Sequence, residues 1–140
     1  MSADTLILFI DGSDNHRAYW IDQLKHCSTD YEIVEASDGQ SGLSLYQSRR
    51  FDCVILEIGL PDQSGFQILG ELVPNVSRPQ VGVIVLTQLH HRGLWELAKE
   101  NGAYACLHKH HTTGEHLDKT IQRAVASVGQ MPKEQRARPG

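Results

Sequence analysis

Five short runs of apolar and β-branched residues recur along the chain, and turn-forming residues bound them. Runs that are apolar on both faces are typical of strands buried within a parallel sheet. We therefore expect five strands, over residues 5–10, 31–36, 53–56, 81–87 and 103–107.

The stretches between these runs carry apolar residues at helical spacing and predict five helices. After the first run, Trp20, Leu24 and Cys27 recur at this spacing, and Asp14 or Asn15 can cap the helix that holds them. The remaining helices are expected over residues 42–49, 64–73, 91–100 and 114–128.

The alternation of strands with helices predicts right-handed crossovers and a parallel sheet with helices on both faces, which is an α/β fold. A length of 140 residues suits one domain. We place this domain at residues 1–128. The polar tail at 129–140 is expected to be a disordered end or a linker.

The net charge and the cysteines limit the classes of protein to which this chain can belong. The formal net charge of −4 comes without a long basic run, so a cationic face for nucleic acid is not expected. No apolar stretch has the length of a membrane span or the flanks of a signal peptide, which makes the cytoplasm the expected location. Cys27, Cys53 and Cys106 form no disulfide framework or Cys-x-x-Cys motif and are expected to be buried free thiols.

Four polar residues stand where strands are expected to end. Glu57 follows the central apolar run, and Asp11, Thr87 and Lys109 mark the ends of three other strands. Open α/β sheets place their ligand sites at the carboxyl ends of the strands, so we expect these side chains to meet at one edge. The loop DGSDN at residues 11–15 matches neither a dinucleotide-binding fingerprint nor a P-loop, so an autonomous enzyme is not expected.

Together with several flanking motifs, these positions resemble the receiver domain of bacterial two-component response regulators. The matching pieces are residues 6–11, Asp38-Gly39, residues 51–61, Gly65-Phe66, residues 83–87, Gly102-Ala103 and Lys109. The resemblance covers nearly the whole chain. It implies a flavodoxin-like three-layer fold with strand order 2-1-3-4-5 and a role as a signalling module of two-component phosphorelays.

The resemblance also assigns roles to the site residues. In the family an aspartate at the position of Glu57 accepts a phosphoryl group, an acid pair after the first strand helps it to hold Mg²⁺, and a Ser/Thr and a Lys bind the phosphoryl oxygens. Here the acid pair is Asp11 followed by Gly12, so one metal-binding carboxylate is missing. Since Mg²⁺ demands near-octahedral oxygen ligands, we expect no cofactor; Mg²⁺ enters only if the chain is a working receiver.

Two further positions depart from the family pattern. His110 follows Lys109 where the family commonly has a cis proline. A cis bond before a non-proline residue costs about 3–4 kcal/mol, so we expect a trans bond and a re-aimed Lys109. Cys106 replaces the aromatic residue that the family uses as a switch, so the coupling of Thr87 to a swinging ring is expected to be absent.

Three interpretations of Glu57 remain open. Its carboxylate can stand in for a phosphoryl group and hold Lys109 by a charge-assisted contact. It can equally be part of a degenerate site in which it simply pairs with Lys109. In the third interpretation Glu57 itself is phosphorylated and the chain is a working receiver, which the demand of this chemistry for precise positioning disfavours.

Histidines form a second candidate site. His90, His91, His108, His110 and His111 follow two strands that are neighbours in this fold, so their imidazoles are expected to share one rim. Such a rim can bind a metal or respond to pH. The irregular spacing favours solvated loop histidines instead.

The expected partners are proteins: a histidine kinase, an output domain or another receiver, with a homodimer as one option. In receivers the docking face is built from the elements that correspond here to residues 91–100, 103–107 and 114–128. Trp95 lies on this face. It can be an interaction anchor, but its pattern favours a buried position.

Overall fold

The computed structural model describes residues 5–129 and contains one parallel sheet. Its strand order is β2-β1-β3-β4-β5, as expected. The strands are β1 (Thr5–Ile10), β2 (Tyr31–Ala36), β3 (Cys53–Leu56), β4 (Gly82–Thr87) and β5 (Ala105–His108). The expected disorder of the tail concerns residues that lie, apart from Gly129, outside the described range.

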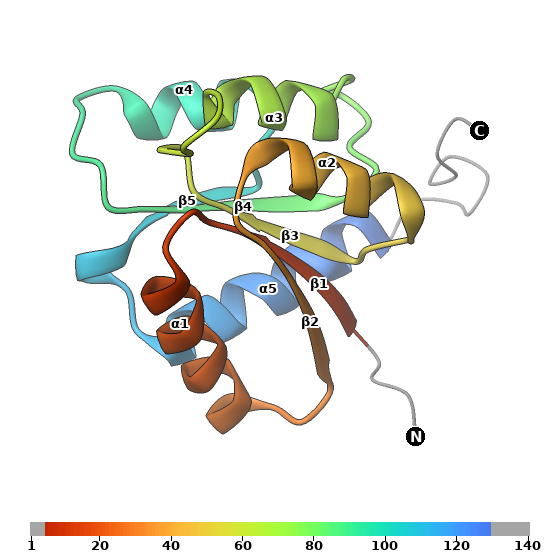
Figure 1. Cartoon of the computed structure of the whole chain (residues 1–140). Coiled ribbons are helices and arrows are strands. Elements are labelled where there is room, and N and C mark those ends of the chain that lie inside the picture. Colours follow the sequence, from red (N-terminus) through yellow and green to blue (C-terminus); the bar gives the residue numbers. More distant parts are fainter. Residues whose placement is uncertain (1–4, 130–140) are drawn as a thin grey trace.

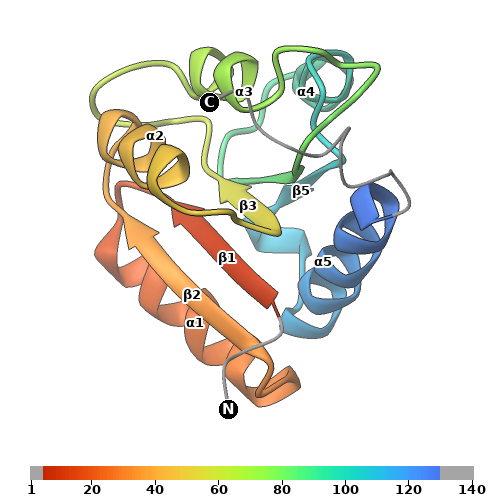
Figure 2. The same ribbon diagram turned by 90° about the vertical axis from the view of Figure 1, so that its right-hand side faces the viewer.

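Helices cover both faces of this sheet, which gives a three-layer α/β sandwich (Figure 1). Figure 2 shows α2, α3 and α4 on one face and α1 and α5 on the other. Their bounds are α1 (Asp14–Cys27), α2 (Gly39–Ser48), α3 (Gly65–Leu72), α4 (Leu94–Glu100) and α5 (Gly114–Gly129).

The pleat of the buried strands divides the core in two. Leu8 and Ile10 of β1 face the cluster under α2, α3 and α4. Ile7 and Phe9 alternate with them and pack toward α1 and α5. All four side chains are fully buried. This explains why the strand reads as apolar without alternation.

The helix starts differ from the predicted ones because capping residues decide them. Ser13, rather than Asp14 or Asn15, caps α1 and accepts a hydrogen bond from the His16 backbone N–H. Asp38 caps α2 in the same way, so this helix begins at Gly39, three residues earlier than expected. Asp38-Gly39 is thus a helix start as well as a turn.

The last third of the chain holds two more corrections. Gly93 has a left-handed φ of 82° and delays α4 to Leu94, so residues 91–93 are not helical. After β5, the expected loop begins with a 3-10 helix, η1 (Lys109–His111). Its N-cap is His108, whose Nδ1 accepts the His110 backbone N–H at 3.1 Å.

The burial predicted for Trp95 is wrong, since 59% of its surface is exposed. On α4 only Ala98 is buried, so this short helix does not turn its tryptophan inward. All three cysteines are free, but Cys27 and Cys106 are only half-buried; the expectation of buried thiols holds fully for Cys53 alone. Within residues 5–129 no helix has the length and apolarity needed to cross a membrane.

Candidate functional site

The four polar residues predicted to meet do so at the carboxyl edge of the sheet. Asp11 follows β1, Glu57 follows β3, Thr87 ends β4 and Lys109 opens η1 after β5. Each strand delivers its residue to the same edge because all neighbouring strands run parallel.

Glu57 lies at the centre of this cluster and both of its carboxylate oxygens are engaged. The Thr87 hydroxyl donates to Oε2 at 2.5 Å, and the Gly59 backbone N–H donates to the same oxygen at 3.0 Å. Lys109 Nζ and the Gln88 backbone N–H donate to Oε1 at 3.0 and 3.2 Å. The carboxylate is therefore held by four donors from three loops.

These donors determine the charge state of Glu57. Burial alone would raise the pKa of its carboxyl group. The hydrogen bonds from Thr87, Gly59 and Lys109, with the positive charge of Lys109, outweigh burial and hold the pKa below its ordinary value. Glu57 is thus a fixed anion at neutral pH.

Lys109 is the cation between two buried acids. Its Nζ lies 2.7 Å from Asp11 Oδ2 and 3.0 Å from Glu57 Oε1, and the side chains are only 6%, 2% and 4% exposed for Lys109, Asp11 and Glu57. Nζ also lies 2.9 Å from His16 Nδ1. The trans bond expected before His110 agrees with the structure, since no described peptide bond is cis. The expected re-aiming of Lys109 is wrong, because its side chain reaches the centre of the site.

Arg17 supports the site from α1. This buried residue donates from Nη1 to the backbone carbonyl of Asp11 at 2.5 Å, and from Nε to Glu35 at 2.9 Å. It also pairs with Asp14. The guanidinium thereby fixes the loop that carries Asp11.

The described residues do not fit Mg²⁺. Gly12 offers no carboxylate, and a Cβ at this position would already lie 3.0 Å from Pro61 Cδ. Asp11 uses Oδ1 to accept the Ser13 backbone N–H and Oδ2 to bind Lys109. Both oxygens of Glu57 are engaged as well. Among residues 5–129 no group of three His, Cys, Asp or Glu side chains is arranged to hold a metal ion.

Thr87 is fixed by hydrogen bonds and not by a Phe, Tyr or Trp ring of β5, whose residue paired with Thr87 is His108. Its hydroxyl donates to Glu57 and accepts the Leu89 backbone N–H at 3.1 Å. Cys106 is the β5 residue paired with Val85 next to this end of β4. Burial and the nearby charge of Glu57 raise the pKa of its thiol.

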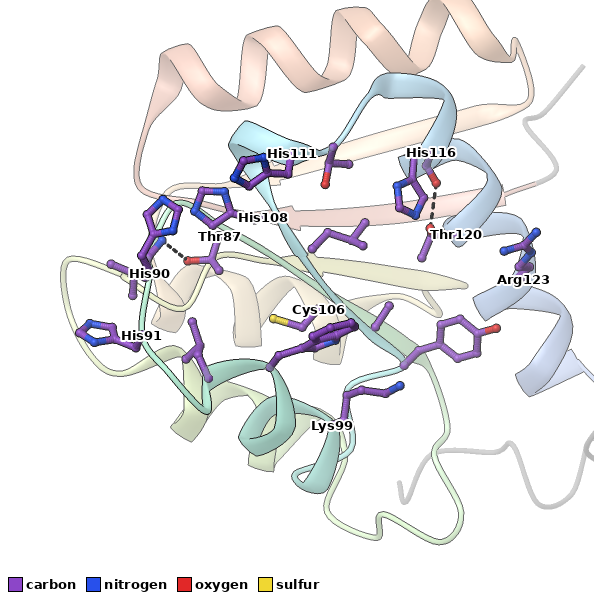
Figure 3. Close-up of a pocket in the computed structure, with 17 residues that line it drawn as sticks. Thr87, His90, His91, Lys99, Cys106, His108, His111, His116, Thr120 and Arg123 are labelled. Carbon is purple, nitrogen blue, oxygen red and sulfur yellow. Dashed lines mark hydrogen bonds between the residues drawn. The ribbon is translucent and has the colours of Figure 1, made fainter.

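The histidine rim forms as predicted for four of its five members. The His90 and His108 rings lie 3.8 Å apart between centroids, and the rings of His110 and His111 lie 5.3 and 5.2 Å from that of His108. Figure 3 shows His91 farther from this group. His108 Nε2 donates to the Gln88 carbonyl at 3.2 Å, because its Nδ1 accepts the cap hydrogen bond of η1.

Three contributors to the site were not predicted from the sequence. Arg17 has a detectable signal, because it lies three and seven residues before Trp20 and Leu24 on the buried stripe of α1. His16 has no such signal, since its direction depends on the cap at Ser13. Gln88 contributes only a backbone N–H, which a sequence does not reveal.

Comparisons with known proteins agree with this architecture. The family model described as the response regulator receiver domain matches residues 7–122. The transcriptional regulatory protein PdtaR of Mycobacterium tuberculosis is 36% identical over 80 residues, covering 56% of this chain and 38% of that protein. The chain therefore spans less than half the length of this relative.

Solved structures give the same picture. A response regulator receiver domain from Clostridium thermocellum is 28% identical with a TM-score of 0.77, covering 89% of this chain and 97% of that one. A CheY-like receiver domain from Methanospirillum hungatei JF-1 has a TM-score of 0.77 at 20% identity, covering 90% and 97%. At that identity, the second likeness shows the fold alone.

Proposed function

The chain belongs to the response regulator receiver domain family, and on that premise we propose that it signals without being phosphorylated. In this proposal the carboxylate of Glu57 takes the place of a phosphoryl group. The domain then acts by contact with a protein partner, and no metal cofactor takes part. The cytoplasmic location expected from the sequence is part of the same proposal.

One observation carries this proposal: the donors that would serve a bound phosphoryl group are all spent on Glu57. A hydroxyl, an ammonium group and two backbone N–H groups converge on its two oxygens. Charge-assisted hydrogen bonds of this kind are stronger than neutral ones. Thr87 and Lys109 are therefore held toward the centre of the site at all times.

The arrangement argues against phosphorylation of Glu57 itself. Phosphoryl transfer relies on positioning and on cations that neutralise the charge of the transferred group. Lys109 is already paired with both Asp11 and Glu57, and the metal ligands are incomplete at Gly12. An incoming phosphoryl group would have to displace both Thr87 and Lys109.

A degenerate site with no signalling role would show the same ion pair. The two interpretations differ in what they expect when Glu57 is changed. Under our proposal, Glu57→Gln weakens partner binding at the face of α4, β5 and α5, where Trp95 and Leu97 are 59% and 45% exposed. A degenerate site predicts unchanged binding. The partner classes are those expected from the sequence: a histidine kinase, an output domain, another receiver or a second copy.

The test is a backbone amide NMR titration with Mg²⁺ followed by beryllofluoride, an analogue of the phosphoryl group. We expect no saturable shifts in the wild type at millimolar Mg²⁺. The matched control is the double variant Gly12→Asp, Glu57→Asp, which restores two carboxylates of the family pattern. We expect this variant to show shifts at residues 59, 87 and 109.

Saturable shifts in the wild type at these residues would overturn the proposal and identify a working receiver.

The histidine rim is a second candidate, as a pH-responsive element, because His108 links Gln88 to η1.

A further inference from the structure

A pocket of about 700 Å³ opens between α4, β5 and α5, with Thr87 among its lining residues. Its apolar lining comes from Leu89, Leu94, Trp95, Tyr104, Ala105 and Cys106. Small-molecule sites in proteins have volumes of roughly 300–1,000 Å³ and are mostly apolar with a few polar groups. The pocket therefore has the size and lining of a ligand site.

Small side chains make this space. In Figure 3, Cys106 lies at the centre of the pocket, with no ring of its own to fill it. Ala105 and Thr87 add little volume to the same wall. The two large aromatic side chains of the lining, Trp95 and Tyr104, are 59% and 38% exposed. They offer flat apolar surfaces to an incoming molecule.

The charged side chains that line the pocket are all basic. His90 and His91 come from the loop after β4, Lys99 from α4, His108 from β5, His111 from η1, and His116 and Arg123 from α5. The other titratable groups are Tyr104 and Cys106. Figure 3 shows these basic side chains spread around the pocket from α4 to α5.

No carboxylate of the described residues lines the pocket, although both flanking helices carry acids. Glu96 and Glu100 on α4 and Glu115 on α5 are absent from the lining. The permanent charges among the lining residues are those of Lys99 and Arg123, both positive. Two cations and five imidazole rings that can donate hydrogen bonds surround an apolar floor, which is complementary to a molecule with an apolar body and an anionic group.

We propose that this pocket binds a small amphipathic anion, with a flat apolar body and one carboxylate, sulfonate or phosphate group. The body lies between Trp95 and Cys106, and the anion faces His111 and His116. The volume and the mostly apolar lining favour a small molecule. The inference stands whether or not Glu57 replaces a phosphoryl group.

The experiment uses two fluorescent probes that differ by one charge. The anionic probe is 8-anilinonaphthalene-1-sulfonate, and the neutral control is N-phenyl-1-naphthylamine, which lacks the sulfonate. We expect saturable binding of the anionic probe to one site, about tenfold tighter than that of the neutral probe, which corresponds to one charge-assisted contact.

Two sets of variants locate the site. Cys106→Phe fills the floor and should abolish saturable binding of both probes, with an unchanged near-ultraviolet circular dichroism spectrum as the check on folding. The exposed pair His111→Gln, His116→Gln leaves the floor intact and should reduce only the preference for the anionic probe. The matched control is Lys25→Gln, His26→Gln on the exposed face of α1, which should behave as the wild type.

Equal affinity of the two probes would overturn the proposal. So would binding that never saturates, or a histidine pair that behaves like the control on α1. Unchanged binding by a folded Cys106→Phe variant would show that the probe lies elsewhere.

Discussion

At the scale of single residues, the extra methylene group of Glu57 explains most of the difference between this site and one with an aspartate at the same position. Compared with an aspartate, Glu57 extends its carboxylate farther from the end of β3, into the donors at Thr87, Gln88 and Lys109. Its own backbone turn at Gly59 supplies the fourth donor. The ionised carboxylate is therefore part of the folded structure.

Replacing Glu57 with Gln should destabilise the protein by about 3 kcal/mol, because removing one partner of a buried ion pair leaves the other charge under-compensated. This loss of stability lies at the low end of the range for buried ion pairs, because Lys109 keeps its ion pair with Asp11. Chemical denaturation measures it. Glu96→Gln, on the exposed face of α4, is the control and should change stability by less than about 0.5 kcal/mol. Equal effects of the two substitutions would contradict the buried ion pair.

The central residues of the site could be predicted from the sequence because they follow recognisable strands. Asp11, Glu57, Thr87 and Lys109 each occupy a position that the parallel sheet brings to one edge. The contact of His16 with Lys109 could not be predicted, since it depends on the rotation of α1 about its axis. That rotation is set by the cap at Ser13, and neighbouring Asp14 and Asn15 were equally plausible caps.

At the scale of elements, α4 shows that the buried face of a short helix cannot be predicted from the spacing of its apolar residues. It contains seven residues, and only Ala98 among them is buried. So few residues do not define an apolar stripe, and the orientation of Trp95 could not be derived from spacing. The left-handed residue Gly93, which sets the start of the helix, also gives no hydrophobic signal.

Gly93→Ala should cost about 1 kcal/mol, because an alanine at a φ of 82° is strained. No atom lies within 4 Å of the added Cβ, so the cost is purely one of backbone conformation. The matched substitution is Gly70→Ala in α3, which also adds a Cβ to open space. It should instead stabilise by about 0.5–1 kcal/mol, since alanine favours a helix interior. Thermal denaturation of both variants should show shifts of opposite sign.

The element η1 should respond to acid through His108. Partial burial and the neighbouring His90, His111 and His110 lower the pKa of His108. A lowered pKa means that the unfolded chain binds the proton more readily, so the contribution to stability falls as the pH drops through the ordinary value of 6.5. Protonation at Nδ1 would also remove the acceptor for the His110 backbone N–H.

The variant His108→Asn tests this link, because the Asn oxygen can accept the same hydrogen bond without titrating. Between pH 7.5 and 5.5 the melting temperature of the wild type should fall more than that of the variant. Parallel curves for the two proteins would show that His108 does not report pH.

At the scale of the whole molecule, the topology was predicted more accurately than the individual elements or residues. A chain in which five strands alternate with five helices can adopt only a few topologies. Because the strands are apolar on both sides, helices must cover both faces of the sheet. The two helical layers follow from these constraints, whereas the order β2-β1-β3-β4-β5 was predicted from the resemblance to receiver domains. Errors gathered where a single cap or glycine decides a boundary, at α1, α2 and α4.

The stability of the whole molecule should not depend on divalent metal. A ligand that binds only the folded state raises the melting temperature with its concentration. Because the oxygens of Asp11 and Glu57 already accept hydrogen bonds from donors of the protein, millimolar Mg²⁺ should leave the melting temperature of the wild type unchanged. The variant Gly12→Asp, Glu57→Asp should gain stability from Mg²⁺ under the same conditions. A rise in the wild type would reveal a metal site.

The Glu57 carboxylate is a permanent part of the protein chain, and this determines how long its contacts in the site last. A phosphoryl group on an aspartate is lost by hydrolysis, so its signal decays. The carboxylate that fills this site cannot be hydrolysed away, and its contacts to Thr87 and Lys109 last as long as the chain is folded. Under the proposed function the duration of the signal is therefore set by synthesis and degradation of the protein and by the dissociation of its partner.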